Sequence, residues 1–301
     1  MYELINISEK KCTNKYVKIF YILTAVLLIC FLLYIFFMYI YNTQKNTLLQ
    51  NSLPIVENIS LTISKEKFNN KKNELLLIKN GTLLNDEQYN NIINIYSTQT
   101  EKTVFLTFDD GPSKTVTPLI LDLLKQEHIK ATFFVLGTNV ERNPELVTRE
   151  YLEGHFIANH GYSHKYSEIY ENSDTILNDY NLCEQAIRTV LNMPNYSCKV
   201  YRFPGGSVGG KYHEIKTNSK ETLKQNHIAY LDWNALTCDA EGAPTRESII
   251  ENLKSTVGSK NVVVLLMHDS SSKILTYDTL PDVISFFREN GYTFKCLYDV
   301  L

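Results

Sequence analysis

Beyond residue 102 the chain alternates between short apolar runs and longer amphipathic stretches. The apolar runs have the length of strands, whereas the longer stretches repeat their apolar residues every three or four positions. Strands that alternate with helices pair in parallel, and about seven such units favour a closed or nearly closed barrel over an open sheet. We therefore expect an α/β fold, a distorted (β/α) barrel, with strands at 104–108, 131–136, 156–159, 201–203, 228–236, 262–267 and 292–297 and helices at 116–126, 144–153, 179–191, 246–256 and 280–289.

A different pattern precedes this domain: residues 19–40 contain no charge and are dominated by Leu, Ile, Phe and Tyr. As a helix this run would be about 33 Å long, enough to cross the hydrocarbon core of a bilayer. A cleaved signal peptide fits poorly, because the run is too long and ends without a small-residue cleavage site. A buried core helix is disfavoured because no polar face appears at any helical period. The run predicts a single transmembrane helix at 19–41.

Lysines set the expected orientation of that helix. Lys10, Lys11, Lys15 and Lys18 precede the apolar run, whereas Lys45 is the nearest positive charge after it. The positive-inside rule then places residues 1–18 in the cytoplasm and the rest of the chain outside the cell, with the helix as a single-pass membrane anchor. The polar stretch 42–101 is expected to be an extracellular stalk, followed by one domain over 102–301.

Charge and cysteine content narrow the possible functions. The formal net charge is −3 at pH 7 and no basic stripe recurs, which argues against nucleic acid as a partner. The cysteines form no Cys-x-x-Cys pair, which argues against a cysteine zinc site or a redox motif. Oligomeric state stays open, as does disulfide pairing outside the cell among Cys183, Cys198, Cys238 and Cys296.

Two adjacent carboxylates, Asp109 and Asp110, end the first strand of the domain, and Gly111-Pro112 follows them directly. The proline forces a turn, so the acidic pair lies on the rim at the carboxyl end of the strand, where α/β folds collect catalytic groups. Adjacent carboxylates repel each other, and one of them needs a cation or a proton nearby. A plain surface turn is the competing interpretation of this motif.

Two histidines, His160 and His164, follow the strand expected at 156–159. At a spacing of i and i+4 they lie on one face of a helical turn, where two imidazoles can bind one metal ion. Either histidine alone would more often be structural or simply exposed. The pair at a strand end is a candidate metal site.

Further polar groups occur at other strand ends. Arg202 precedes a Phe-Pro-Gly-Gly loop whose glycines allow backbone N–H groups to approach a ligand, and the arginine could orient a carboxylate. His268 ends the apolar strand at 262–267, a position from which a general acid can act. Asp232-Trp233 and Asp239 flank another strand end, although a buried tryptophan is usually part of a core.

Together these groups supply complementary roles. One carboxylate and two histidines make a metal site with open positions, which is typical of catalytic sites. The other carboxylate could take a proton from the attacking water, and a separate histidine could protonate a leaving group. An arginine and a further aspartate would orient these two.

Over residues 102–301 the chain resembles the polysaccharide deacetylases of carbohydrate esterase family 4, which have a NodB-homology domain. The segment Thr107-Phe108-Asp109-Asp110-Gly111-Pro112 matches the first motif of that family. The resemblance implies that Asp109 is the catalytic base and Asp110 a metal ligand. His160-Gly161-Tyr162-Ser163-His164 is similar to the second motif, which implies that both histidines bind the metal.

The later motifs follow in the same order. Arg202-Phe203-Pro204-Gly205-Gly206 is similar to the third, in which the arginine holds the catalytic aspartate and a backbone N–H, here that of Gly205, helps to bind the oxyanion. Leu266-Met267-His268 resembles the last, which implies that His268 is the acid and Leu266 lines the acetyl pocket. Asp239 matches the residue that tunes the acid.

Two departures from the family pattern concern the substrate groove. Many members carry an aromatic residue where this chain has Gly205, so a more open groove wall is expected here. Many members also follow the fourth-motif aspartate with Trp, whereas Asp239 is followed by Ala240. Trp233 could replace part of the missing hydrophobic wall.

The sequence therefore predicts a membrane-anchored, metal-dependent N-deacetylase that acts on N-acetylglucosamine residues of a cell-wall glycan, with peptidoglycan as the first candidate. The expected ion is zinc, with cobalt or manganese as alternatives. Other candidate substrates are chitin oligomers, an exopolysaccharide and O-acetylated xylan. A non-catalytic wall-binding protein is the rival from another class, and a membrane sensor is a third hypothesis.

Overall fold

The computed structural model describes residues 32–41, 43, 84–241 and 244–301. The chain divides into two units, Met1–Glu74 and Leu75–Leu301. In the first unit, residues 32–41 are helical and most of their side chains are exposed. Within the described residues, no helix is both long enough and apolar enough to cross a membrane. Residues 19–31 of the predicted anchor, and most of the predicted stalk, lie outside the described residues.

The second unit is built on a parallel sheet whose central strand is β1 (Thr103–Asp109). The strand order is β5-β4-β3-β2-β1-β7-β6, and β8 pairs with the first half of β1 while β2 pairs with its second half. No ladder joins β5 to β6 among the described residues, so the barrel is incomplete. The other strands are β2 (Thr132–Val135), β3 (Phe156–Asn159), β4 (Val200–Tyr201), β5 (Ala229–Tyr230), β6 (Ala235–Leu236), β7 (Val262–His268) and β8 (Thr293–Lys295).

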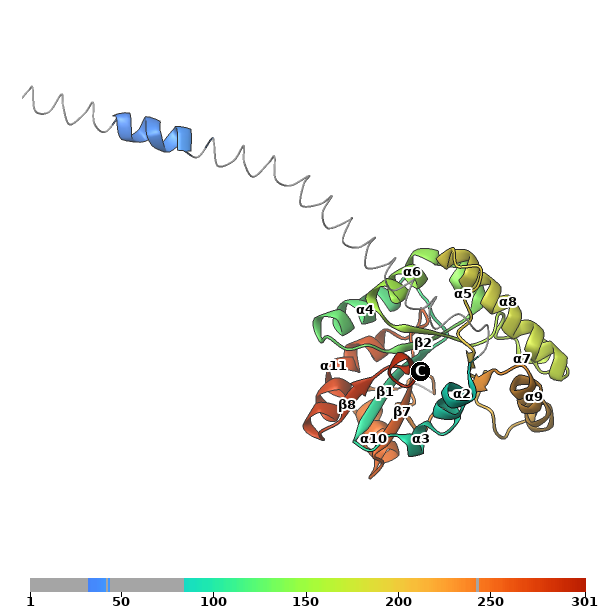
Figure 1. Cartoon of the computed structure of the whole chain (residues 1–301). Coiled ribbons are helices and arrows are strands. Elements are labelled where there is room, and N and C mark those ends of the chain that lie inside the picture. The colour runs from blue at the N-terminus through green and yellow to red at the C-terminus, as the bar shows by residue number, and fades with distance from the viewer. Residues whose placement is uncertain (1–31, 42, 44–83, 242–243) are drawn as a thin grey trace, which may run out of the picture. The chain divides into compact units, whose positions relative to one another are not determined.

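Helices lie around the strands of this sheet (Figure 1). All seven residues of β1 are buried, as expected for a parallel strand covered on both sides. The described helices after β1 are α4 (Thr117–Gln126), α5 (Gly137–Arg142), α6 (Pro144–Glu153), α7 (Tyr166–Ile169), α8 (Ser173–Leu191), α9 (His213–Gln225), α10 (Arg246–Val257), α11 (Ile274–Glu289) and the 3-10 turn η1 (Leu297–Asp299). The predicted α/β fold with about seven parallel strands is confirmed.

Some elements differ from the prediction. The long strand expected at 228–236 is divided into β5 and β6, with residues 231–234 between them. Helix α9 was not predicted because its buried face contains Lys216 and Ser219 beside the single apolar residue Leu223. Helix α8 begins six residues earlier than expected, where Asn172 caps its first turn.

Two helices precede residue 102, the predicted start of the domain, and pack on the sheet. Helix α2 (Asp86–Ile93) contacts the edge strand β5, and α3 (Ile95–Thr98) contacts β7, next to the other edge strand β6. Ile92 and Ile95 are fully buried by this packing. The Tyr96 hydroxyl donates a hydrogen bond to the carbonyl of Asp232, beyond the end of β5 (3.1 Å). The pair therefore covers the side on which the barrel is not closed.

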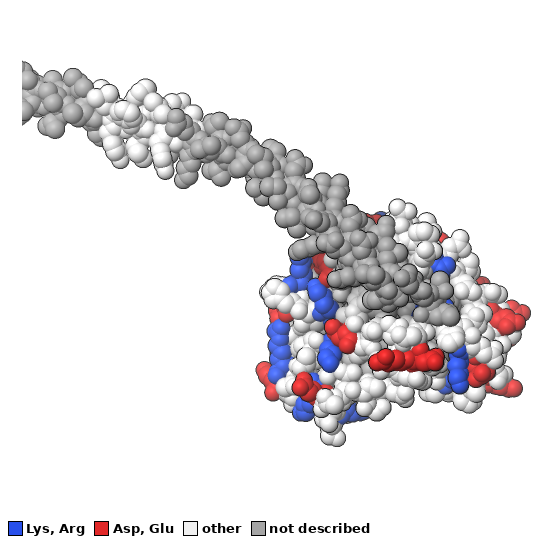
Figure 2. All heavy atoms as spheres, viewed as in Figure 1, with Lys and Arg blue, Asp and Glu red and all other residues white. Residues whose placement is uncertain are grey.

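Charged residues are mixed over the visible face of the second unit. Figure 2 shows Lys and Arg side chains interspersed with Asp and Glu over the described part of that face. The four cysteines whose pairing was left open, Cys183, Cys198, Cys238 and Cys296, are free thiols.

Candidate active site

The carboxyl ends of four strands bring the predicted residues together. In the parallel ladder between β1 and β7, Asp109 lies directly beside His268. In the strand order, β3 and β4 lie on the side of β1 away from β7. Strand β3 ends one residue before His160, and β4 ends one residue before Arg202. Because parallel strands end at the same edge of a sheet, groups that are up to 159 positions apart in the sequence share one rim.

A buried ion pair anchors the first of these groups. The Arg202 guanidinium donates to Asp109 Oδ1 at 2.8 Å and to Thr107 Oγ1 at 2.7 Å. The centroid of the Phe134 ring lies 3.8 Å from the guanidinium carbon of Arg202. The Arg202 side chain is fully buried from solvent. Burial raises the pKa of Asp109, and the positive charge of Arg202 opposes that rise. The pair keeps the carboxylate in a fixed position on β1.

The second carboxylate faces two imidazoles. Ligand atoms of Asp110, His160 and His164 all lie within 4.8 Å of one another. Asp110 Oδ1 is buried without a hydrogen bond, 3.5 Å from Nε2 of His160 and 3.3 Å from Nε2 of His164. Two separate turns position these groups, with left-handed backbone at Asp110 (φ 72°) in one and at His164 (φ 56°) in the other.

The chemistry of this cluster fits a bound cation. His160 Nδ1 lies 2.8 Å from the carbonyl oxygen of Arg202, which can only accept, so Nδ1 carries the proton and Nε2 presents a lone pair. Burial lowers the pKa of His160 to about 3, which keeps the ring neutral. A lone pair and a carboxylate oxygen at this separation repel each other unless a positive charge lies between them. The three residues therefore fit the predicted divalent ion.

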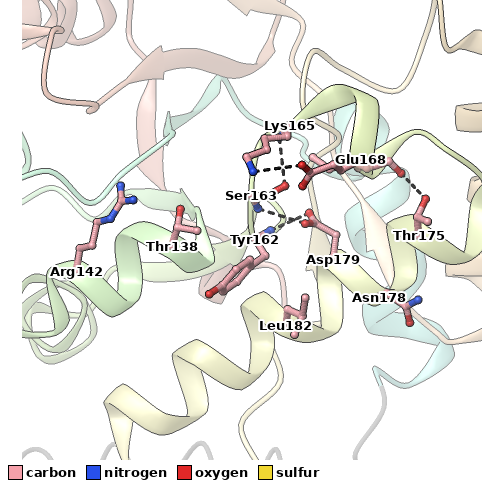
Figure 3. A pocket seen from close by; sticks show the side chains of 11 residues that line it. Thr138, Arg142, Tyr162, Ser163, Lys165, Glu168, Thr175, Asn178, Asp179 and Leu182 are labelled. Carbon is pink, nitrogen blue, oxygen red and sulfur yellow. Dashed lines mark hydrogen bonds and ion pairs between the residues drawn. The ribbon is translucent and has the colours of Figure 1, made fainter.

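The loop between the two histidines is held from behind by helix α8. The Asp179 carboxylate accepts hydrogen bonds from the backbone N–H groups of Tyr162 (2.8 Å) and Ser163 (3.2 Å). Gly161 has φ 84°, and a Cβ there would lie 2.2 Å from Asp179 Oδ2, so only glycine fits. Beside this loop, a hollow of about 600 Å³ opens between α5, α7 and α8, and Tyr162 and Asp179 line it (Figure 3).

A second acid–histidine pair lies on the β7 side. His268 Nδ1 is 3.0 Å from Asp239 Oδ1, and Asp239 Oδ2 accepts from the His268 backbone N–H and from Thr276 Oγ1. Burial by itself lowers the pKa of His268, but the hydrogen bond and charge of Asp239 outweigh it and raise the pKa to about 9. His268 is therefore a cationic acid at neutral pH.

The loop after β4 presents an unused backbone donor. Gly205 adopts φ 72°, and its N–H makes no hydrogen bond to any described residue. The Tyr170 hydroxyl donates to the Pro204 carbonyl at 2.6 Å. Since a trans peptide points its C=O and N–H in opposite directions, Tyr170 fixes the direction of the Gly205 N–H. Further along the loop, Asp232 accepts from the N–H and hydroxyl of Ser207.

Comparison with known proteins identifies this arrangement. The polysaccharide deacetylase family matches residues 96–225. A peptidoglycan-N-acetylglucosamine deacetylase of Bacillus cereus is 32% identical over 203 residues, which cover 66% of this chain and 70% of that protein. This chain belongs to the polysaccharide deacetylase family. Its members in carbohydrate esterase family 4 hydrolyse the N-acetyl amide bond, and this deacetylase is a hydrolase of that class.

Two further relatives show the extent of the similarity. The peptidoglycan-N-acetylglucosamine deacetylase PgdA of Listeria monocytogenes is 32% identical over 196 residues, which cover 65% of this deacetylase but only 38% of that protein. The solved structure of a Streptococcus mutans CE4 esterase is 33% identical, with a TM-score of 0.61, and covers 71% of this chain and 91% of that one. The shared region is thus the catalytic domain.

Two predicted residues of the deacetylase remain, Leu266 and Trp233. Leu266 lies two residues before His268 on β7, so both side chains leave the same face of the strand, and Leu266 is buried. Trp233 is half-buried, and its ring lies 3.2 Å from the place a Cβ on Gly206 would take. The prediction that Trp233 replaces a missing groove wall stays a prediction.

Asp232, which the sequence placed at a strand end, holds the loop after β4 through Ser207. Three other groups at the site of this deacetylase were not predicted. Asp179, Tyr170 and Thr276 each hold a loop or side chain of the site through hydrogen bonds. None of the three has a local sequence signal, because each acts through a contact with a segment 17 to 37 residues away.

Removing the charge of Asp239 should shift the pH range in which the deacetylase works. In Asp239→Asn the carboxylate that raises the pKa of His268 is lost and burial, which lowers that pKa, remains. His268 then loses its proton at a lower pH, so the alkaline limb of kcat/KM, near pH 9 in the native protein, moves toward neutrality. Initial rates of acetate release measured between pH 6 and 10 test this. An unchanged alkaline limb would exclude His268 as the acid that Asp239 tunes.

Proposed function

We propose that this chain is a membrane-anchored, metal-dependent deacetylase that removes the acetyl group from N-acetylglucosamine residues of peptidoglycan outside the cell. The observation that carries the reaction is the convergence, on one rim, of a candidate metal cluster, a buried carboxylate, a cationic histidine and a free backbone N–H. The printed activity of the Bacillus cereus and Listeria relatives supports the choice of peptidoglycan.

Asp110, His160 and His164 would hold the ion. Two imidazoles and one carboxylate leave coordination positions open, which suits zinc, and cobalt or manganese could serve with the same donors. When bound, such an ion acts as a Lewis acid that makes water more acidic and polarises the acetamide carbonyl. The protein residues around it would move the protons and hold the substrate.

Asp109 would act as the base. Its Oδ2 lies 3.7 Å from His160 Nε2, at the border of the ligand cluster, while Arg202 holds Oδ1. The free oxygen can therefore take a proton from water that attacks the acetamide carbon. The raised pKa of Asp109 makes it a stronger base than an exposed aspartate.

His268, the partner of Asp109 in the β1–β7 ladder, would act as the acid. Held by Asp239, the imidazolium would protonate the leaving amine as acetate separates. The Gly205 N–H would donate to the carbonyl oxygen as it gains negative charge, a contribution worth about 3 kcal/mol by order of magnitude. Leu266 would contact the acetyl methyl group.

Substitution of the two neighbouring aspartates separates metal binding from proton transfer. Asp110→Ala should lose both the ion and the activity, because it removes one of three ligands. Asp109→Asn keeps the shape and can still accept from Arg202, so it should retain the ion but lose turnover by about 1000-fold. Metal content by elemental analysis and acetate release from the same preparations give the comparison. Normal turnover by metal-loaded Asp109→Asn would show that another group is the base.

The choice of polymer needs a direct comparison of substrates. Acetate release by the metal-loaded protein would be measured on purified peptidoglycan, chitin oligomers, poly-N-acetylglucosamine and O-acetylated xylan. We expect the highest kcat/KM on peptidoglycan. Faster reaction on one of the others would reassign the substrate, and metal binding without acetate from any of them would favour the wall-binding hypothesis.

Anchoring rests on the uncharged run at 19–40 and the lysines before it. In a bacterial host, the full chain should sediment with membranes and resist extraction by high salt, while a chain of residues 42–301 should not. Protease added to intact spheroplasts should digest the domain of the full chain. Recovery of the full chain in the soluble fraction, or protection of its domain, would contradict the anchor or its orientation.

A further inference from the structure

The side chain of Tyr166 stands at the edge of the candidate metal cluster. Helix α7 begins at Tyr166, two residues after His164, and the two rings meet edge to face with centroids 5.4 Å apart. On its other side the Tyr166 ring meets Tyr170 at 5.7 Å, also edge to face. These contacts hold the ring in place while 37% of the residue stays exposed on the rim.

The Tyr166 hydroxyl lies against Gly205. A Cβ built on Gly205 would be 2.6 Å from Tyr166 Oη, so the hydroxyl takes the space of the side chain that glycine lacks. The Tyr166 hydroxyl makes no hydrogen bond to any described residue. It lies beside the loop after β4 and is thus available to a ligand.

Two donors therefore lie at Gly205. The first is its own N–H, whose direction Tyr170 sets through the Pro204 carbonyl. The second is the Tyr166 hydroxyl, which comes from a segment 39 residues earlier in the sequence. Stabilisation of an oxyanion requires donors that are already positioned before the charge develops, and two donors give more stabilisation than one.

We propose that Tyr166 is a catalytic residue whose hydroxyl, together with the Gly205 N–H, donates a hydrogen bond to the acetamide oxygen of the substrate. This inference rests on the deacetylase function proposed above. Tyr166 keeps its proton throughout: its hydrogen bond shortens as the carbonyl oxygen gains negative charge and lengthens again when acetate forms. Its contribution should therefore appear in kcat more than in KM.

Tyr166→Phe tests the hydroxyl while it preserves the ring contacts with His164 and Tyr170. We expect kcat on the best substrate to fall by about 100-fold, the usual effect of losing one oxyanion donor, with a small change in KM. Tyr212→Phe is the matched control, since the Tyr212 ring belongs to the same aromatic group, with its centroid 5.1 Å from that of Tyr170, while the three atoms nearest to a Cβ on Gly205 all belong to Tyr166. Its kcat should stay within twofold of the native value. Metal content and thermal unfolding of each variant show whether the site is intact.

Binding of acetate provides a readout that does not depend on turnover. Calorimetric titration of the zinc-loaded protein with acetate should show weaker binding to Tyr166→Phe than to the native chain and to Tyr212→Phe, by about fivefold or more. Native-like kcat and native-like acetate affinity in Tyr166→Phe would overturn the role of Tyr166 and leave the deacetylase function standing. If the native chain releases no acetate from any substrate, the proposed function fails, and the acetate titration alone decides whether Tyr166 binds a carboxyl oxygen.

Discussion

The buried pair of Arg202 and Asp109 is the interaction on which the rest of the site depends. Placing two charges where no water reaches them is costly unless every donor finds a partner. Besides Asp109, the guanidinium of Arg202 donates to Thr107 and to the carbonyls of Leu231 and Asp232, so each of its nitrogens has a partner. The side chain therefore joins the ends of β1, β4 and β5, while the backbone carbonyl of Arg202 accepts from His160 and sets which nitrogen of that ring can bind a metal.

This pair also explains how two adjacent aspartates acquire different properties. Asp109 ends β1 with ordinary strand geometry, and its side chain points to the buried arginine. Asp110 has left-handed backbone, which redirects its carboxylate toward the imidazoles at the rim. The repulsion expected between neighbouring carboxylates is avoided because each faces a different partner, one a fixed guanidinium and the other a ligand cluster.

The sequence predicted the parts of the site that strand ends determine. Asp109, His160, Arg202 and His268 could be placed on one rim because apolar runs end beside them and parallel strands end together. The groups that support them could not be predicted. Tyr170 lies just after a helix of four residues, too short to have a periodic pattern, and its role depends on a contact with a loop 34 residues later. The helices before residue 102 were missed because most of their residues are polar.

The absence of a side chain at Gly205 and the position of the Tyr166 side chain depend on each other. A side chain at position 205 would have to adopt φ 72°, which costs most residues about 1 kcal/mol, and it would meet the Tyr166 hydroxyl at once. Glycine removes both costs and lets the Tyr166 side chain from α7 approach the loop after β4. Tyr166 thus occupies, from another segment, the space next to position 205 that a Cβ would take, while the more open groove wall stays a prediction. A pattern read along one motif cannot reveal such a replacement, since the compensating residue follows the metal histidines and meets the glycine only through the fold.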